Sequence, residues 1–201
     1  ITKHGAKPSF KGLYGFPSSL CISVNEQVIH GIPGEYMLKD GDIVSIDCGA
    51  CIDGFHGDAA RTFPVGNISS DAQKLIDITK ESFFKGIEYA KVGNKLGDVS
   101  HEIQSYVEAA GFSVVRDFVG HGIGANVHED PNVPNFGKAG IGPDLVKGMV
   151  LAIEPMVNIG NHKVKTLRNG WTVVTRDSSL SAHYENTVAI LSDGPEILTL
   201  V

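Results

Sequence analysis

Apolar and polar residues alternate in several short segments of the chain, which is the pattern of half-buried β-strands. Residues 20–30 alternate in this way, and Gly31-Ile32-Pro33-Gly34 then stops the pattern. Residues 42–50 and 55–63 flank Asp53-Gly54, a dipeptide typical of a two-residue hairpin turn. We therefore predict one strand followed by a β-hairpin.

The apolar spacing changes to three and four residues from Ala72 onward, which predicts an amphipathic helix. Either Ser69 or Ser70 can cap its N-terminus, and we expect the helix to end near Gly93.

A second helix is predicted next, with Asp98 as its N-cap and Gly111 just past its end. Alternation returns over residues 150–158, 171–175 and 184–191, which predicts three more strands. Hairpin-rich sequence thus occurs in both halves of the chain, as in an internal duplication. The order of elements favours an α+β fold in which helices pack on the outer face of a pseudo-twofold antiparallel sheet.

The composition is that of a single globular domain. Hydrophobic residues make up 42% and charged residues 20% of the 201 residues, and no Pro-, Gly- or Ser-rich linker divides them. The net charge of -6 disfavours both a dedicated nucleic-acid binder and a binder of anionic membranes. No run approaches the roughly 18 apolar residues that span a bilayer, and Ile1-Thr2-Lys3-His4 contains no signal-peptide core. We expect a cytoplasmic protein.

The three cysteines, Cys21, Cys48 and Cys51, do not suggest a disulfide framework in a chain of this length. Cys48 and Cys51 raise the question of a zinc or redox site. A structural zinc site needs two further ligands at similar spacing, and the sequence offers no second pair. Residues three apart in a regular strand also point to opposite faces, so we do not expect these thiols to share a metal.

Two carboxylates are expected to converge on the predicted hairpin. If Asp53-Gly54 forms the turn without a bulge, Asp47 lies opposite Ala60, and Asp58 is its diagonal neighbour on the same face. Like charges so close are unfavourable unless they are protonated or a cation bridges them.

The second half repeats this problem. Glu154 interrupts the apolar run 149–157, and Glu185 precedes a predicted apolar strand. A buried, unpaired carboxylate costs several kcal/mol or becomes protonated. Either Arg61, Arg168 or other separate cations neutralise the four carboxylates, or the carboxylates share two divalent metal ions.

Histidine favours the metal interpretation. Gly120-His121-Gly122-Ile123-Gly124 places an imidazole between glycines, where the backbone can bend closely around a ligand, and His128 follows seven residues later. A phosphate loop is the alternative, but no Gly-Lys-Ser/Thr ending follows the glycines. Four carboxylates and one His suit Mn, Fe, Co or Zn in a hydrolytic site better than a closed structural site.

Several of these residues lie in a series of motifs along the chain. The motifs are Gly15-Phe16-Pro17, Cys21-Ile22-Ser23-Val24-Asn25-Glu26, Val28-Ile29-His30-Gly31-Ile32-Pro33, Asp47, His56-Gly57-Asp58, Gly120-His121-Gly122-Ile123-Gly124, Glu154-Pro155-Met156 and Tyr184-Glu185-Asn186-Thr187. In this order they resemble the motifs of the type I methionine aminopeptidases, which have the pita-bread metallopeptidase fold, and the resemblance extends from about Phe10 to the C-terminus.

The resemblance implies a hydrolase that removes the N-terminal, initiator methionine from nascent proteins and peptides with two divalent metal ions (Co, Mn, Fe or Zn). It implies that Asp58 and Glu185 bridge the metals, within a ligand set of Asp47, Asp58, His121, Glu154 and Glu185. Glu154 would accept or shuttle the proton of the attacking water. His128 would stabilise the attacked carbonyl oxygen, and His30 would hydrogen-bond near the scissile amide.

The resemblance also implies a methionine pocket lined by Phe16, Cys21 and Trp171, in which sulfur would contact aromatic edges. The alternative is that these three residues are simply core. Leu13 and Val127 stand where some bacterial members carry aromatic residues, so we expect a pocket that is wider or differently bounded.

Two other functions stay open at this point. A Xaa-Pro aminopeptidase or prolidase-like hydrolase shares the scaffold, but such proteins usually carry a large extra N-terminal domain. A catalytically inactive pita-bread binding protein would not need a complete site. The absence of a long insertion between His121 and Glu154 favours type I over type II.

The family resemblance further implies a monomer whose residues 1–201 form one catalytic domain and lack an N-terminal helical segment. Residues 161–168 and Arg176 are locally basic. We expect them to form a solvated hairpin face, and the functional alternative is transient contact with the ribosome.

Overall fold

The computed structural model describes residues 1–200. Its helices are α1 (Ser70–Ile87) and α2 (Leu96–Ala109), with 3-10 turns at Thr2–His4 and Leu13–Gly15. The strands are β1 (Lys7–Pro8), β2 (Cys21–Val24), β3 (Gln27–Ile29), β4 (Ile43–Ile52), β5 (Phe55–Pro64), β6 (Ser113–Val114), β7 (Gly120–Gly122), β8 (Glu129–Val133), β9 (Val150–Ile153), β10 (Met156–Asn158), β11 (Val164–Thr166), β12 (Val173–Thr175), β13 (Ser181–His183), β14 (Asn186–Leu191) and β15 (Gly194–Ile197).

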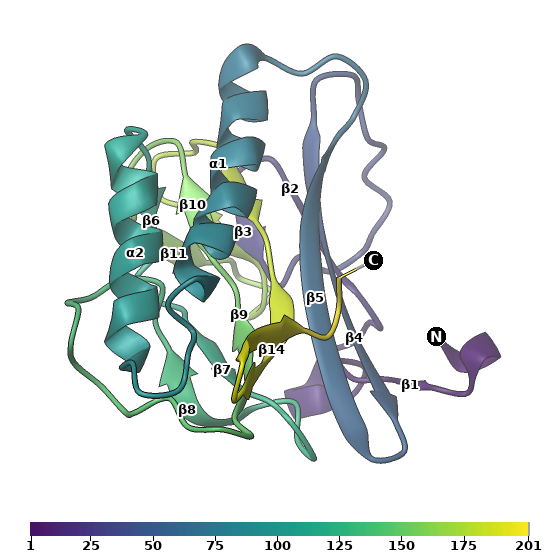
Figure 1. Cartoon of the computed structure of the whole chain (residues 1–201). Helices are drawn as coiled ribbons and strands as arrows, with labels where there is room; N and C mark the ends of the chain where they lie inside the picture. Colours follow the sequence, from purple (N-terminus) through teal and green to yellow (C-terminus); the bar gives the residue numbers. More distant parts are fainter. Residues whose placement is uncertain (201) are drawn as a thin grey trace.

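The strands form four antiparallel sheets. In one sheet β4 pairs with β1, β2 and β5, and in the largest the order is β15-β14-β9-β7-β8. The two smaller sheets have the orders β13-β10-β6 and β11-β12-β3. Figure 1 shows α1 and α2 side by side over one face of the strands, with the long β4–β5 hairpin next to α1. The predicted α+β class is confirmed.

The β4–β5 hairpin has the predicted turn and register. Asp53 and Gly54 both have positive φ, 51° and 86°, as a two-residue type I′ turn requires. Asp47 lies opposite Ala60, and Gly49 lies opposite Asp58. Asp47 and Asp58 are therefore diagonal neighbours on one face of the hairpin.

Two segments predicted as single strands are each broken into two. Residues 20–30 form β2 and β3, because Asn25 takes a left-handed conformation (φ 55°) and turns the chain. Residues 150–158 form β9 and β10, which are separated by Glu154-Pro155. Proline has no N–H to donate to a strand ladder, so the run cannot continue through it.

The helix predictions are right in position and wrong in two details. The Ser69 hydroxyl accepts a hydrogen bond from the Ala72 N–H (3.2 Å), as predicted for an N-cap. The first helix ends at Ile87, before Gly93. Asp98 is not an N-cap, because the second helix begins two residues earlier and the Asp98 carboxylate accepts the Lys95 N–H from within its first turn (2.8 Å).

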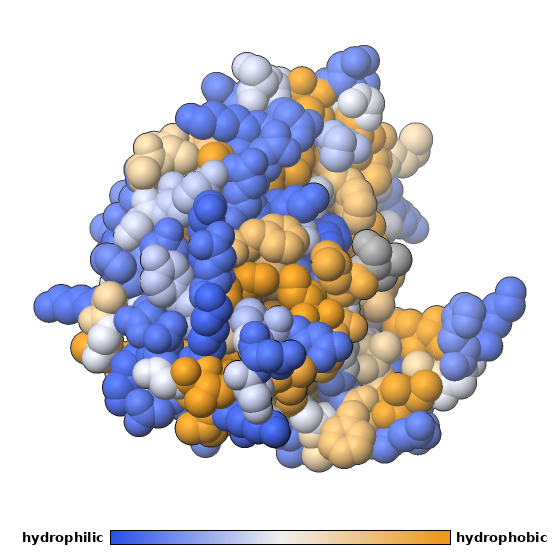
Figure 2. All heavy atoms as spheres, in the orientation of Figure 1, coloured by the Kyte–Doolittle hydropathy of each residue, from blue (hydrophilic) through white to orange (hydrophobic). Residues whose placement is uncertain are grey.

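The main core lies between the helices and the largest sheet, where Phe83, Ile103, Leu151 and Ile190 are fully buried. Figure 2 shows a mostly hydrophilic surface over the helices, while apolar side chains gather where α1 meets β5 and β14. Within residues 1–200, no helix combines the length and apolar character needed to cross a membrane.

Candidate metal centre

Both halves of the fold deliver carboxylates to one cavity. Its lining includes every predicted metal ligand, namely Asp47, Asp58, His121, Glu154 and Glu185. The backbone of Glu185 joins that of Ala60 through two hydrogen bonds (3.0 and 3.4 Å). The Thr187 hydroxyl accepts the Asp58 N–H (2.8 Å), so β5 and β14 are held together beside the carboxylates.

Asp58 and Glu185 are buried, and Asp47 and Glu154 are nearly so, without a neutralising Lys or Arg side chain. Burial, reinforced by the charge of Glu154, raises the pKa of Asp58 to about 7, and burial raises the pKa of Glu154 to about 7. Burial and the charges of neighbouring carboxylates raise the pKa values of Asp47 and Glu185 well above their usual range. Deprotonating all four at neutral pH therefore requires added positive charge.

Arginine does not supply that charge. Arg61 donates to the carbonyl oxygens of Ala60 and Glu185 and to Asn186 Oδ1, and it stacks over the Tyr184 ring. Arg168 is exposed on the hairpin formed by β11 and β12. Among residues 1–200, no Lys or Arg forms an ion pair with the four carboxylates. The alternative in which each carboxylate is neutralised by its own basic side chain is therefore wrong for these residues.

The side chains fit a divalent metal. Ligand atoms of Asp58, His121 and Glu185 all lie within 4.8 Å of one another. Oδ1 of Asp47 and Oδ1 of Asp58 are buried and have no hydrogen-bond partner. His121 Nδ1 lies 2.9 Å from the Gly122 carbonyl oxygen, which can only accept, so Nδ1 carries the proton and Nε2 keeps a lone pair. Buried oxygen donors and a free imidazole nitrogen form a metal-ligand cluster.

The glycines around His121 serve strand packing. A Cβ on Gly120 would lie 2.2 Å from the Ala152 carbonyl oxygen, and one on Gly122 would lie 2.2 Å from the Asp130 carbonyl oxygen. Only glycine lets β7 fit between β8 and β9. His121, which lies between these glycines, faces the cavity.

His30 and His128 line the same cavity. His30 follows β3 with a left-handed φ of 57°, and burial lowers its pKa to about 4. The exposed His128 ring packs edge-on against His121 (4.5 Å between centroids) and stacks on Tyr14 (5.8 Å, 4° between planes). Loss of hydration on the side that faces the cavity, together with the nearby His30, lowers the pKa of His128. A neutral imidazole offers one donor and one acceptor.

An apolar cluster forms the wall of the cavity, whose volume is about 110 Å³. Phe16 and Trp171 meet edge to face (5.1 Å), and Cys21 lies with them. Leu13 lines the cavity too, and Val127 packs against its wall. The sequence analysis missed Phe10, which is 7% exposed and supplies a further aromatic wall.

Two other motifs lie away from this cavity's lining. Cys48 and Cys51 are free thiols. The basic segment forms β11 and the turn toward β12, and Lys165 and Arg168 are exposed there, as expected of a solvated hairpin face.

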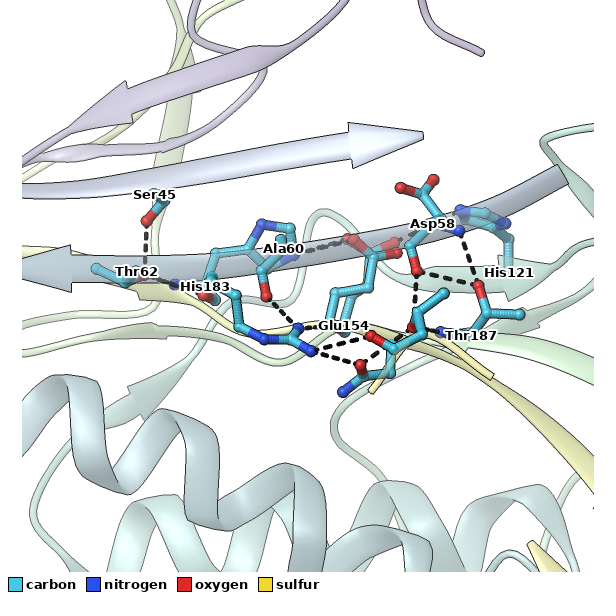
Figure 3. A network of polar contacts seen from close by, with 12 residues as sticks. Ser45, Asp58, Ala60, Thr62, His121, Glu154, His183 and Thr187 are labelled. Atoms are coloured by element: carbon cyan, nitrogen blue, oxygen red, sulfur yellow. Dashed lines mark hydrogen bonds and ion pairs between the residues drawn. The ribbon is translucent and has the colours of Figure 1, made fainter. Parts of the chain in front are cut away.

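The sequence analysis also missed His183. Its side chain is 2% exposed, and Nε2 lies 3.4 Å from Glu154 Oε2 and 4.0 Å from Glu185 Oε2. Figure 3 shows the His183 ring and the Glu154 carboxylate facing each other, joined by a dashed line. No local pattern marked it, because His183 ends β13, just before the predicted strand 184–191 and outside the family motifs.

Comparisons with known proteins agree with this geometry. The family model described as Metallopeptidase family M24 matches residues 2–192. The methionine aminopeptidase of Clostridium perfringens is 77% identical over 201 residues, which is 100% of this chain and 81% of that protein. The crystal structure of methionine aminopeptidase from Rickettsia prowazekii has a TM-score of 0.98 at 46% identity, covering 100% of this chain and 81% of that one.

The fold is shared more widely. The prolidase from Pyrococcus horikoshii OT3 has a TM-score of 0.71 at 24% identity, and the match covers 90% of this chain and 47% of that one. At this identity the likeness concerns the fold alone.

Proposed function

The chain belongs to metallopeptidase family M24, among its methionine aminopeptidases, and we propose that its buried carboxylate cluster binds two divalent cations. The pita-bread fold and the aminopeptidase function expected from the sequence are confirmed at 77% identity over the whole chain. The proposed ligands are Asp47, Asp58, His121, Glu154 and Glu185, with Asp58 and Glu185 shared between the cations.

One observation carries the metal proposal. Four carboxylates, two of them fully buried, meet in a partly apolar pocket without any Lys or Arg ion pair among the described residues. Two dications would balance their charge, and Co, Mn, Fe and Zn all suit oxygen and imidazole donors. When bound, such cations supply positive charge that lowers the pKa of water and polarises a carbonyl group.

We propose that the chain's own groups move the proton and hold the peptide. Glu154 accepts the proton of the attacking water at its carboxylate and passes it to the leaving amine. His128, which Tyr14 and His121 hold in place, donates to the oxygen of the attacked carbonyl. His30, directed by its left-handed backbone, hydrogen-bonds near the scissile amide.

We propose that Phe16, Cys21 and Trp171, together with Phe10, bind the methionine side chain. Sulfur at an aromatic edge contributes about 0.3–1.5 kcal/mol. A free α-amine, which a residue inside a chain lacks, would sit near one of the two bound cations. This combination favours an N-terminal methionine as the substrate.

We also propose that residues 1–201 act as one monomeric catalytic domain in the cytoplasm, on nascent chains. The exposed basic hairpin over residues 161–168 would make transient ribosome contact. Salt-dependent cosedimentation with ribosomes tests this, and an unchanged result after Lys165→Glu and Arg168→Glu would contradict it.

The main test is release of free methionine from Met-Gly-Met-Met by metal-stripped protein, with and without added Co or Mn. A Xaa-Pro peptide serves as the control substrate. We expect metal-dependent release from the first peptide and none from the second. Folded protein that releases no methionine with any metal would overturn the proposal, and cleavage of the Xaa-Pro peptide would favour the prolidase alternative.

A further inference from the structure

His183 is a buried polar side chain that the reaction described above does not use. It ends β13 and is 2% exposed, and its Nε2 atom has no hydrogen-bond partner. A buried polar atom without a partner costs roughly 1–3 kcal/mol. The position of this nitrogen therefore needs an explanation.

The backbone of His183 is fixed against the β4–β5 hairpin. The Thr62 hydroxyl donates to the His183 carbonyl oxygen (2.9 Å) and accepts the His183 N–H (2.9 Å). Since that hydroxyl proton is already used, the Ser45 hydroxyl must donate to Thr62 (2.7 Å). The strand that carries Asp58 thus also sets where the imidazole lies (Figure 3).

The Glu154 carboxylate lacks a donor of its own. Its backbone carbonyl accepts from Asn135 Nδ2 (2.9 Å), but within residues 1–200 no group hydrogen-bonds to its side chain. His121 Nε2 lies 3.8 Å from Oε1, but its proton resides on Nδ1, so it cannot donate. His183 Nε2, 3.4 Å from Oε2, is close enough to become a donor after a small rotation.

We propose that His183 is a positioning residue, whose Nε2–H donates to Oε2 of Glu154 and fixes the orientation of that carboxylate. The hydrogen bond gives the buried Nε2 atom a partner, gives the Glu154 carboxylate a donor, and leaves Oε1 facing the cavity. This proposal rests on the role assigned to Glu154 in the proposed function. Outer partners of metal ligands act in this way, and their loss typically lowers metal affinity or activity 10- to 100-fold.

Two substitutions of His183 distinguish a role as hydrogen-bond donor from a role that only fills space. His183→Gln keeps a neutral N–H donor, whereas His183→Leu keeps volume and removes the donor. We expect calorimetry with Mn to show about 10- to 100-fold weaker binding at one site of His183→Leu, and kcat to fall while KM changes little. In His183→Gln both quantities should stay within about threefold of the parent.

Ser181→Ala is the matched control. Ser181 lies on the same strand and is buried, but its hydroxyl contacts the Val157 carbonyl oxygen outside the site. We expect Mn affinity and kcat to match the parent. Equal impairment of the Gln and Leu variants, or an unimpaired Leu variant, would overturn the proposal.

Nitrogen-15 spectra of the Zn-loaded parent provide a test that does not depend on a variant folding. The Nε2–H tautomer of His183 is expected, and the Nδ1–H tautomer would overturn the proposal, because Nε2 would then have no proton to donate. The parent's own metal-dependent release of methionine tests the function separately. A parent that is active while His183 fails these tests contradicts only the role of His183.

Discussion

Individual charges in the cavity can be removed without changing side-chain size, which gives the sharpest tests at the residue scale. Asp58→Asn removes one carboxylate charge from a position that is 4% exposed. We expect it to abolish tight binding of the second metal, because an amide cannot bridge two cations as a carboxylate does, while the fold stays intact. Calorimetric titration with Co or Mn measures the number of tight sites.

Asp144→Asn is the control for this titration. Asp144 pairs with Lys95 on the surface, away from the cavity lining, and should keep both sites. Unchanged two-site binding in Asp58→Asn would remove this residue from the ligand set.

His128 is predicted to act on the substrate and not on the metal. His128→Ala should lower kcat by about 100- to 1000-fold, the usual effect of losing a donor to the attacked carbonyl oxygen. Metal content measured on the same protein should equal that of the parent. His101→Ala changes an exposed histidine on α2 and should leave kcat unchanged. A fully active His128→Ala would exclude the proposed role.

At the scale of elements, the β4–β5 hairpin also shapes the substrate pocket. A Cβ on Gly49 would lie 2.6 Å from Phe10 Cε1 and 2.8 Å from Ser9 Cβ. Gly49→Ala should therefore displace Phe10 and raise KM for a methionine peptide several-fold, with a smaller effect on metal affinity. Steady-state kinetics beside calorimetry distinguish the two effects.

Gly57→Ala is the matched change on the partner strand. The nearest atom to its Cβ would be Thr199 Cγ2 at 3.6 Å, an ordinary contact. KM should stay at the parent value. An equal rise in KM in both variants would mean that the hairpin, and not the Phe10 wall, is perturbed.

At the scale of the whole molecule, the buried carboxylates link stability to pH and metal. In the metal-free fold the pKa values of Asp58 and Glu154 are raised to about 7, and those of Asp47 and Glu185 lie well above their ordinary values of 3.8 and 4.5. The folded state therefore holds protons that the unfolded chain has already released, and stability falls as pH rises through the folded-state pKa values. His30 and His183, whose pKa values are lowered to about 4, are neutral in both states above pH of about 7 and do not contribute there.

Thermal unfolding between pH of about 7 and 8, where Asp58 and Glu154 lose their remaining protons, checks this. The Tm of chelator-treated protein should fall with rising pH, and the Tm gain on adding metal should grow, because protons no longer compete for the ligands. Asp58→Asn should weaken the pH dependence of the metal-free protein. A metal-free Tm that rises with pH would contradict the carboxylate linkage.

Local sequence determined the position of most helices and strands and the register of the β4–β5 hairpin. The turn Asp53-Gly54 fixed the register that makes Asp47 and Asp58 diagonal neighbours, because a two-residue turn leaves one pairing without a bulge. Apolar periodicity located α1 and α2. Motif order was enough to identify the family, which the comparisons confirm.

Only the tertiary structure decided how the two halves meet. Glu185 reaches Asp58 because its backbone pairs with Ala60, a contact between positions more than a hundred residues apart that no local pattern encodes. Phe10 and His183 were missed for the same reason, because neither lies within a recognised motif. Phe10 is positioned by contact with β4 and His183 by hydrogen bonds to β5, and both strands are distant in the sequence. Where Arg61 points was likewise open until its partners were known. Sequence specified which carboxylates would be buried, and long-range strand packing decided that they would share one cavity without an arginine among them.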